Sequence, residues 1–414
     1  MTEGRMLGLP VVRTAAPWPD ESLDVAALRA SGWRPTPFRD LVLKVHQRCN
    51  LACDYCYVYT LADQSWRERP RVMDRPTWLA AAARMAEHAE AHRLPSMRLI
   101  LHGGEPLLAG ADRLDRLVRD FRSAMPASCR LDVQLQTNGV LLDRTTIERL
   151  RARGVTVGVS LDGTAADNDR HRRLPSGAGS FASVDRALRL LGSPPYASSF
   201  AGLLCTVDPT TDPLACYDTL LGYSPPLIDF LLPHANWSAP PARDPAAGPT
   251  PYADWLIPIF DRWYDAPHQE TRIRFFEDVM ALALGGAGHS EQVGLSPVAV
   301  VVVETDGAIE QADSLKSAYP GACATGLTVT TGSFDAALSH PGVAARQIGL
   351  RALADACLRC PVHSVCGGGH YAHRYVAGEG FRNPSVYCAD MLRLIQHVVG
   401  RMTADLQRRV RSHA

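Results

Sequence analysis

The sequence predicts an α/β protein, a partial (β/α)6 barrel of parallel strands followed by a smaller C-terminal domain. Six apolar stretches of strand length each precede a segment with helical periodicity, and apolar strands of this kind are typical of parallel sheets. Polar residues end these stretches, and a glycine-rich segment at 284–297 separates them from the rest of the chain. We therefore expect a lead segment over residues 1–37, the barrel over 38–284 and the second domain over 285–414.

The six strand–helix units follow one another along the first two thirds of the chain. The expected strands are 41–45, 97–102, 131–136, 155–161, 200–207 and 227–232. The expected helices are 76–92, 111–125, 144–153, 181–191, 213–221 and 252–264. Right-handed crossovers repeated in this way either close into a partial barrel or form an open, doubly wound sheet.

The positions of the polar residues favour the barrel. Five of the strands end in short polar sequences: His102-Gly103-Gly104-Glu105, Thr137-Asn138-Gly139, Ser160-Leu161-Asp162-Gly163, Thr206-Val207-Asp208 and His234-Ala235-Asn236. In a barrel the carboxyl ends of all strands form one rim, whereas an open sheet gathers its ligands at one switch point. Polar groups at these five strand ends therefore predict a site at the rim.

The C-terminal part has a different pattern. Residues 298–303, followed by Thr305-Asp306-Gly307, predict a β-hairpin. The segment 387–410 predicts a helix, because its apolar residues recur on one helical face. They are Met391, Leu394, Ile395, Val398, Met402 and Leu406. We expect this face to pack against the core.

The composition excludes several classes of protein. Hydrophobic residues make up 46% of the 414 residues, which is ordinary for a globular protein. Lys+Arg and Asp+Glu both total 43, so no net field attracts a nucleic acid. The chain contains neither an apolar run of about 20 residues nor a signal-peptide core. We expect a cytoplasmic protein that binds neither nucleic acid nor membrane.

The eleven cysteines are the unusual feature of the composition. Without an export signal, an odd number of cysteines in a large protein argues against a disulfide framework. Seven of them form two tight groups, and metal binding is the usual reason for such groups in a reducing compartment. The other four are scattered, and we expect them to be small buried residues. They are Cys129, Cys205, Cys216 and Cys323.

The first group, Cys49-x3-Cys53-x2-Cys56, directly follows the first predicted strand. Three thiolates at this spacing can hold one 4Fe–4S cluster and leave one iron without a protein ligand. The alternatives are a zinc knuckle, with His46 as the fourth ligand, or simply buried thiols.

This spacing, with the aromatic Tyr55 before the last cysteine, resembles the radical S-adenosylmethionine (SAM) superfamily. Gly103-Gly104-Glu105-Pro106 is similar to the segment of that family that binds the methionine amino group. Glycines allow the backbone to approach the ligand, and a carboxylate complements an ammonium group. The resemblance also implies that Tyr55 lies against the adenine, that Ser160 and Asp162 contact the ribose and carboxylate, and that Arg172 pairs with the methionine carboxylate. A turn cap for Asp162 and a surface charge for Arg172 are the alternatives.

In this superfamily the open iron chelates SAM, and one electron from the cluster cleaves it to methionine and a 5′-deoxyadenosyl radical. The radical removes an unactivated hydrogen atom from the substrate. The role of the protein is to hold SAM and substrate in line within a dry barrel.

The second group, Cys357-x2-Cys360-x5-Cys366 with Cys388, supplies four thiolates, enough for a closed cluster or a closed zinc site. Beside the first group it resembles the SPASM-type C-terminal extension, which implies an auxiliary 4Fe–4S cluster. The usual extension carries two such clusters, but here His370 stands where a further cysteine is expected. The stretch 294–312 contains no cysteine either. We therefore expect one auxiliary cluster, with Cys323 or His370 as the alternatives that would complete a second.

Asp313 directly follows the stretch without cysteines. Asp313 resembles an aspartate of family members that oxidise their substrate. In those enzymes this aspartate acts as the general base that takes a proton from the substrate radical. The resemblance therefore implies this catalytic role for Asp313. Capping of a turn is the alternative.

Several stretches together resemble the FxsB-type branch of the SPASM enzymes, the cyclophane-forming peptide maturases. The likeness covers nearly the whole chain from residue 38 onward, chiefly at 38–64, 234–237, 304–317 and 366–388. It implies an enzyme that joins an aromatic ring carbon to the Cβ atom of a nearby residue in a ribosomally made precursor peptide. It also implies an electron donor such as a flavodoxin or ferredoxin.

Residues 1–37 are too short for a winged-helix module that binds a leader peptide, so other parts of the chain or a separate protein would recognise the substrate. The candidate peptide contacts are His234, Trp237, Arg243, His373, Arg374 and Tyr375. The alternative activities are thioether formation and formylglycine-type oxidation of a serine or cysteine. A non-catalytic, zinc-stabilised peptide-binding protein is the alternative from a different class.

Overall fold

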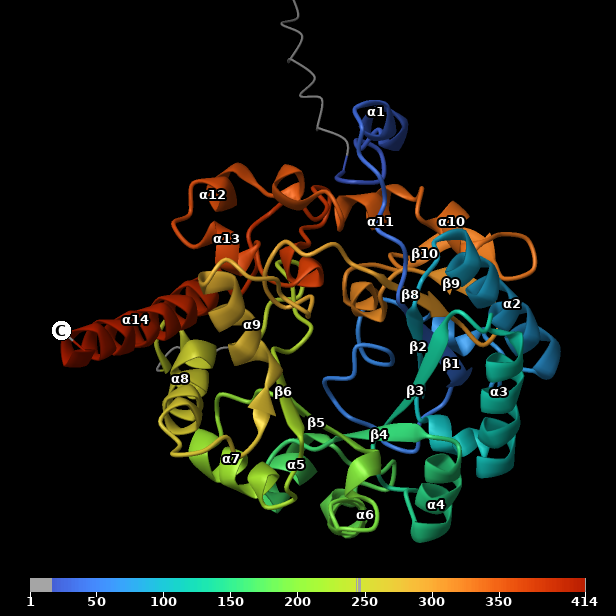
Figure 1. Ribbon diagram of the computed structural model, residues 1–414, viewed down its shortest axis with the longest axis horizontal. Helices are drawn as coiled ribbons and strands as arrows, with labels where there is room; N and C mark the ends of the chain where they lie inside the picture. The colour runs from blue at the N-terminus through green and yellow to red at the C-terminus, as the bar shows by residue number, and fades with distance from the viewer. Residues whose placement is uncertain (1–16, 243, 245–246, 414) are drawn as a thin grey trace, which may run out of the picture.

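The computed structural model describes residues 17–242, 244 and 247–413 of the chain. Six parallel strands form its centre, and helices surround them on the outside (Figure 1). The strands are β1 (Asp40–His46), β2 (Ser96–Gly103), β3 (Arg130–Thr137), β4 (Val155–Ser160), β5 (Phe200–Thr206) and β6 (Leu227–Leu231). All six predicted strands are present, and the α/β prediction with its parallel sheet is confirmed.

The helices that follow the strands begin and end within two residues of their predicted bounds. They are α2 (Arg75–Ala91), α3 (Ala111–Ala124), α4 (Arg144–Ala152), α6 (Phe181–Leu191), α7 (Pro213–Leu221) and α8 (Pro251–Tyr264). Aspartates fix three of the starts, because each side chain accepts a hydrogen bond from a free backbone N–H of the first turn. The capping residues are Asp74, Asp143 and Asp212. A short helix missing from the prediction, α5 (Ala165–His171), lies between β4 and α6.

The sheet continues beyond the six strands, in the order β10-β9-β8-β1-β2-β3-β4-β5-β6-β7. On one side β7 (Arg272–Ile273) pairs with β6, and on the other β8 (Val300–Val303) pairs in parallel with β1. The predicted hairpin is confirmed: β8 turns through Gly307 (φ 87°) into the antiparallel β9 (Ala308–Glu310). Strand β10 (Ala324–Thr328) then pairs with β9. The C-terminal hairpin thus extends the sheet of the barrel along the edge of β1.

The remaining segments are short, except for the last helix. The α-helices are α1 (Val25–Ala30), α9 (Arg274–Ala283), α10 (Phe334–Ala337), α11 (Pro341–Ala345), α12 (Asp355–Leu358), α13 (His363–Cys366) and α14 (Cys388–His413). The 3-10 turns are η1 (Ser65–Arg67), η2 (Pro106–Ala109), η3 (Ala197–Ser199), η5 (Asp313–Ser317), η6 (Gly349–Ala352) and η7 (Tyr371–Arg374). Among the described residues, none of these helices has the length and apolarity needed to cross a membrane.

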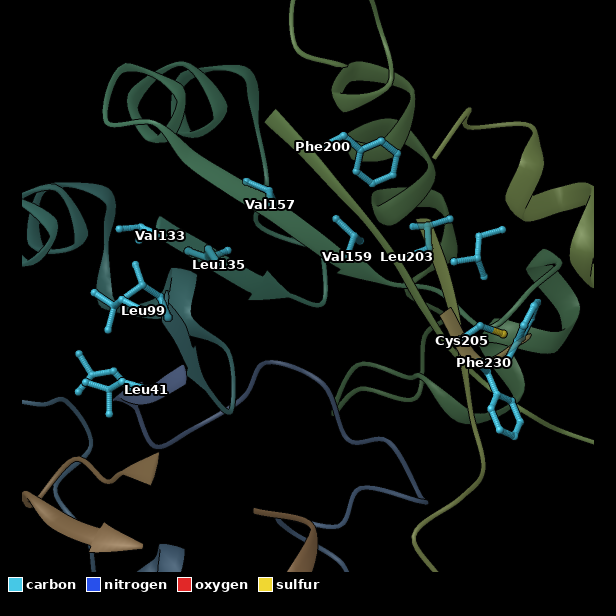
Figure 2. Close-up of a cluster of buried hydrophobic side chains, with 14 of the residues drawn as sticks. Leu41, Leu99, Val133, Leu135, Val157, Val159, Phe200, Leu203, Cys205 and Phe230 are labelled. Atoms are coloured by element: carbon cyan, nitrogen blue, oxygen red, sulfur yellow. The ribbon is translucent and has the colours of Figure 1, made fainter. Parts of the chain in front are cut away.

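The apolar core lies between the sheet and the helices. Figure 2 shows part of it, where side chains from neighbouring strands meet, among them Leu99, Val157, Leu203 and Phe230. The four scattered cysteines, among them Cys205, are all buried, as predicted.

Helix α14 packs on α8 and α9, with five of its six predicted apolar residues buried. Leu406 was expected on the same packed face, but its side chain is 55% exposed. The reason is geometric: the last turns of α14 project beyond the helices on which its first turns pack (Figure 1).

We predict that Leu394→Ala lowers the free energy of unfolding by about 2–5 kcal/mol, because it leaves a cavity in the core beneath α14. Leu406→Ala, a matched change on the same helix, should shift it by less than about 0.5 kcal/mol. Urea unfolding under anaerobic conditions measures both values. Equal effects of the two changes would contradict the docking of α14 described here.

Candidate active site

A cavity of about 240 Å³ opens at the carboxyl ends of the barrel strands. Its wall contains residues from the ends of β2 to β6, as the polar strand ends predicted, together with the loop that follows β1 and Arg172 at the end of α5. The polar wall residues include His102, Gln136, Thr137, Asn138, Ser160, Thr206 and His234. The predicted site therefore lies at the rim of the barrel.

Cys49, Cys53 and Cys56 all line this cavity. Burial raises the pKa of Cys49 to about 11 and that of Cys53 to about 12. The sulfur of Cys49 accepts hydrogen bonds from the backbone N–H of Leu51 (3.4 Å) and from Nδ2 of Asn138 (3.6 Å). Bound iron would keep such thiols deprotonated, and N–H donors stabilise the thiolate. The donor set thus fits a cluster held by three cysteines, whereas His46, the fourth ligand of the zinc alternative, is not part of the wall.

The two glycines of the predicted SAM segment line the cavity and also allow two chain segments to touch. A Cβ atom on Gly103 would overlap the carbonyl of His46, and one on Gly104 would overlap the hydroxyl of Tyr59. Backbone N–H groups of Gly104 and Glu105 donate to the carbonyls of His46 (2.9 Å) and Arg48 (3.0 Å). The segment with these glycines lies so close to the cysteine loop that neither position has room for a side chain.

Glu105 lies behind the cavity wall and is fully buried. Its carboxylate accepts hydrogen bonds from Leu107 N (2.9 Å), Thr137 Oγ1 (2.8 Å) and Asn138 N (2.8 Å). It thereby joins the segments that follow β2 and β3. A carboxylate has room for a fourth donor, so contact with the ammonium group of SAM remains a prediction.

Tyr55, Asp162 and Arg172 form one buried group. The hydroxyl of Tyr55 donates to the carboxylate of Asp162, and Nη1 of Arg172 lies 2.9 Å from that hydroxyl. Asp162 also accepts from the backbone N–H of Thr206 (2.9 Å). Arg172 is only 7% exposed, so the surface-charge alternative is wrong, and Asp162 bonds across strands rather than capping its own turn.

The predicted SAM contacts therefore lie together at the rim. Tyr55, Ser160 and Arg172 line the cavity, while Asp162 supports them from behind. Ser160 accepts a hydrogen bond from Nε2 of Gln136 (3.1 Å). Their specific contacts with SAM remain predictions.

The second cysteine group also converges. Cys357, Cys360, Cys366 and Cys388, from α12, α13, the turn between them and the start of α14, line one small cavity of about 60 Å³. Burial raises the pKa of Cys366 to about 11. The guanidinium of Arg374 supports the loop by donating to the carbonyls of Gly367 and Gly369, both at 2.6 Å. Four thiols that line one small cavity fit a metal site closed by four protein ligands, although Cys388 itself is exposed.

Cys323 and His370, the alternatives for a second auxiliary site, are separate from these four thiols. Cys323 is buried with its sulfur 3.3 Å from the carbonyl of Ala312. His370 lies against His234 and His373.

Asp313 begins the turn η5 within a buried network of charges. It pairs with Lys44 of β1 and lies 3.9 Å from Lys316, which in turn pairs with Glu304. Burial opposes ionisation of Asp313, but the charges of Lys44 and Lys316 outweigh it and hold its pKa at about 2. No cap hydrogen bond is formed at this turn, so the turn-cap alternative is not supported.

Asp313 is not part of the cavity wall, but two residues connect it to the cavity. His102 lines the cavity, and its Nδ1 lies 3.2 Å from the amine of Lys44. The sequence analysis missed Lys44 and Lys316. The one signal for this network in the sequence was Lys44 itself, which lies inside the apolar strand Leu41–Val45. A charged side chain is buried in such a strand only when it has a partner of opposite charge.

The candidate peptide contacts differ in their accessibility to a substrate. His234 lines the cavity, and Trp237 is 48% exposed with its indole N–H bound to the carbonyl of Pro384. His373 and Arg374 are buried, so they are not accessible to a peptide in this structure. Tyr375 packs on Tyr319 and Phe381. Arg243 lies outside the described residues.

Comparison with known proteins identifies the barrel. Residues 43–193 match the radical SAM superfamily. The chain contains a radical SAM domain. It is therefore an enzyme, and the alternative of a non-catalytic zinc protein is wrong. The domain implies SAM and a 4Fe–4S cluster as cofactors.

Two relatives are similar to this chain over most of its length. A cysteine-type anaerobic sulfatase-maturating enzyme of Clostridium perfringens is 26% identical over 67% of this chain and 74% of its own length. A serine-type anaerobic sulfatase-maturating enzyme of Klebsiella aerogenes is 25% identical over 86% of this chain and 87% of its own.

Two solved structures share the fold. Native anSMEcpe with bound AdoMet has a TM-score of 0.74 and 21% identity, and the match covers 88% of this chain and 98% of that one. Streptococcus suis SuiB bound to the precursor peptide SuiA has a TM-score of 0.57 and 14% identity, over 86% of this chain and 77% of SuiB.

We predict that Cys53→Ala removes about four iron atoms per chain, because the three thiols of the rim would share one 4Fe–4S cluster. Cys129→Ala, which changes a buried thiol of the core, serves as the matched control and should leave the iron content unchanged. Iron and sulfide assays on anaerobically reconstituted protein measure both. Unchanged iron in Cys53→Ala would contradict the assignment.

Proposed function

We propose that this enzyme joins an aromatic ring carbon to the Cβ atom of a nearby residue in a ribosomally synthesised precursor peptide. The aromatic and aliphatic residues in the cavity wall are the observation that best supports this proposal. Beside the three thiols the wall presents Tyr57, Tyr59, Leu231 and Leu232, a surface that suits aromatic and aliphatic peptide side chains. The names of the relatives, which act on sulfatases, and the peptide bound to SuiB support a peptide or protein substrate.

Different residues at the rim would hold the two cofactors. Cys49, Cys53 and Cys56 would hold the 4Fe–4S cluster. Those that would hold SAM are Tyr55, Gly103, Gly104, Glu105, Ser160, Asp162 and Arg172. When bound, the two cofactors supply a 5′-deoxyadenosyl radical that takes a hydrogen atom from carbon, and a flavodoxin or ferredoxin supplies the electron.

The four-thiol site belongs to the part of the chain, residues 285–414, that we propose as an auxiliary domain beside the barrel at 38–284. Cys357, Cys360, Cys366 and Cys388 would hold one auxiliary 4Fe–4S cluster, which supplies one-electron transfer. Because all four thiols converge, no iron would be left open for the substrate. Electron transfer is therefore the role that suits this site.

Forming one crosslink removes two hydrogens from the peptide. The Cβ–H bond breaks by loss of a hydrogen atom, the new carbon–carbon bond forms, and the ring then loses a proton and an electron to become aromatic again. We propose Asp313 as the group that receives this proton, by way of His102 at the cavity and Lys44 behind it.

The second candidate is formylglycine-type oxidation of a serine or cysteine, which the names of both sulfatase-maturating relatives favour. It requires the same loss of a hydrogen atom, a proton and an electron. The two products differ in one chemical property: formylglycine is an aldehyde, whereas a cyclophane contains none. Thioether formation, the remaining alternative, requires a cysteine in the substrate.

Anaerobic co-expression with a ribosomally synthesised precursor peptide that contains an aromatic residue tests the proposal. We expect a peptide lighter by two hydrogens per crosslink, resistant to fragmentation at one aromatic residue and unreactive toward a hydrazide probe. A hydrazide adduct would establish formylglycine instead. A product that forms only when the peptide contains cysteine would indicate a thioether, and either outcome overturns the crosslink.

We predict a split phenotype for Cys360→Ala combined with Cys388→Ala. The variant should lose about four iron atoms per chain and still cleave SAM to 5′-deoxyadenosine, but accumulate no crosslinked peptide, since the second electron has no acceptor. Cys323→Ala, the control for a thiol outside this site, should retain iron and product. Full product formation by the double variant would contradict the electron-transfer role.

A further inference from the structure

Three histidine rings meet between the barrel and the C-terminal segment. His234 follows the end of β6, while His370 and His373 stand at the start and within the turn η7. Residues three apart on a 3-10 turn share one face, so η7 directs both of its histidines the same way. The ring centroids are 5.4 Å (His234–His370), 5.9 Å (His234–His373) and 4.8 Å (His370–His373) apart. One ring nitrogen of each residue lies within 4.8 Å of the others.

Two nitrogens in this group have no hydrogen-bond partner. They are Nδ1 of His234 and Nε2 of His373, both buried. Buried polar atoms in proteins are almost always paired, so two unpaired imidazole nitrogens in one cluster indicate a missing partner. Burial lowers the pKa of His234 to about 4 and the pKa values of His370 and His373 well below their usual range. Burial thus favours the neutral form of all three rings, the form in which histidine binds metal.

Apart from the two cysteine groups, the other clusters of metal-binding residue types within the described chain are already paired. In the group of His88, His92 and Asp335, one carboxylate oxygen contacts both rings, at 2.6 and 2.8 Å. In the group of Glu304, Glu310 and Asp313, lysines and an arginine neutralise the carboxylates. The three histidines are the group without such compensation.

A carboxylate, Glu291, lies near His370 but beyond hydrogen-bond distance, and it pairs with Arg346. Nε2 of His370 lies 4.0 Å from Glu291, and its Nδ1 accepts a hydrogen bond from Ala372 N (3.2 Å). Histidine ligands usually direct their second N–H toward a carboxylate or carbonyl. A metal on Nδ1 would replace the bond from Ala372 and leave the N–H on Nε2 facing Glu291.

We propose that His234, His370 and His373 bind one divalent transition-metal ion, of which Zn²⁺ is the simplest case. Imidazole suits Zn²⁺, and three ligands leave a fourth position open. Of the three ligands, His234 lines the cavity, so the site borders the substrate space. A carboxylate, carbonyl or imidazole of the substrate can occupy the open position and fix the peptide against the rim. This second role rests on the peptide substrate proposed above, whereas metal binding does not.

Equilibrium dialysis of the iron-loaded enzyme against Zn²⁺, followed by metal analysis, tests the site without substrate. We expect about one zinc per chain in the wild type and none in His373→Gln or His234→Gln. These two variants change different elements, and unaltered iron and sulfide content identifies the folded ones. His92→Gln, which alters the other histidine pair, should still bind zinc. Absence of zinc from the wild type, or its loss in His92→Gln alone, overturns the proposal.

Two further measurements sharpen the test. Glu291→Gln should weaken zinc binding by about 10–100-fold, the usual effect of removing a carboxylate behind a ligand. Adding the precursor peptide should tighten zinc binding by about 5–150-fold, because two ligands that contact each other are coupled reciprocally. Zinc binding that the peptide leaves unchanged would retain the metal site and overturn its role in holding substrate. Crosslinking without bound zinc would also overturn that role, while leaving the proposed reaction intact.

Discussion

A buried network of balanced charges connects the barrel to the C-terminal hairpin, and the arrangement of the site depends on it. Lys44 of β1 and Arg69 of the following loop face Glu304, Glu310, Asp313 and Lys316 from the chain around β8, β9 and η5. Three cations meet three carboxylates, and both lysines are almost fully buried. Removing one partner would leave an uncompensated buried charge, which destabilises proteins by about 3–5 kcal/mol.

This balance has consequences for proton transfer. Burial raises the pKa of Glu310 to about 7, while the neighbouring lysines hold that of Asp313 at about 2. Of the two carboxyl groups, Glu310 is therefore the more easily protonated. His102 and Lys44 connect the network to the cavity, and this is the route by which we propose that Asp313 receives its proton.

The rim is held together in a comparable way by Glu105. Its three hydrogen bonds join the loops that follow β2 and β3, and Asn138, one of its donors, also bonds Cys49. The close approach allowed by Gly103 and Gly104 adds the cysteine loop to this assembly. The loops that follow three strands are thus held together by the protein's own contacts, which favours the ordered geometry that radical chemistry requires.

The local pattern of the sequence predicts much of this architecture. The apolar strands, the capped helices, the hairpin at Gly307 and the convergence of the first three cysteines all depend on short-range signals. The pairing of β8 with β1, the charges around Lys44 and the three histidines depend on residues that are distant in the chain. Spacing alone carries no information about such contacts, and the exposure of Leu406 likewise depends on where α8 ends.

We propose that two separate thiol sites hold two clusters, of which only the rim cluster would have an iron open to SAM. Electron paramagnetic resonance of the dithionite-reduced enzyme, with and without SAM, tests it most directly. We predict two cluster signals, of which SAM alters one, and the SAM-sensitive signal should be absent from Cys53→Ala. Two signals that SAM leaves unchanged would contradict the assignment of a SAM-binding cluster to the rim. A SAM response that persists in Cys53→Ala would contradict it as well.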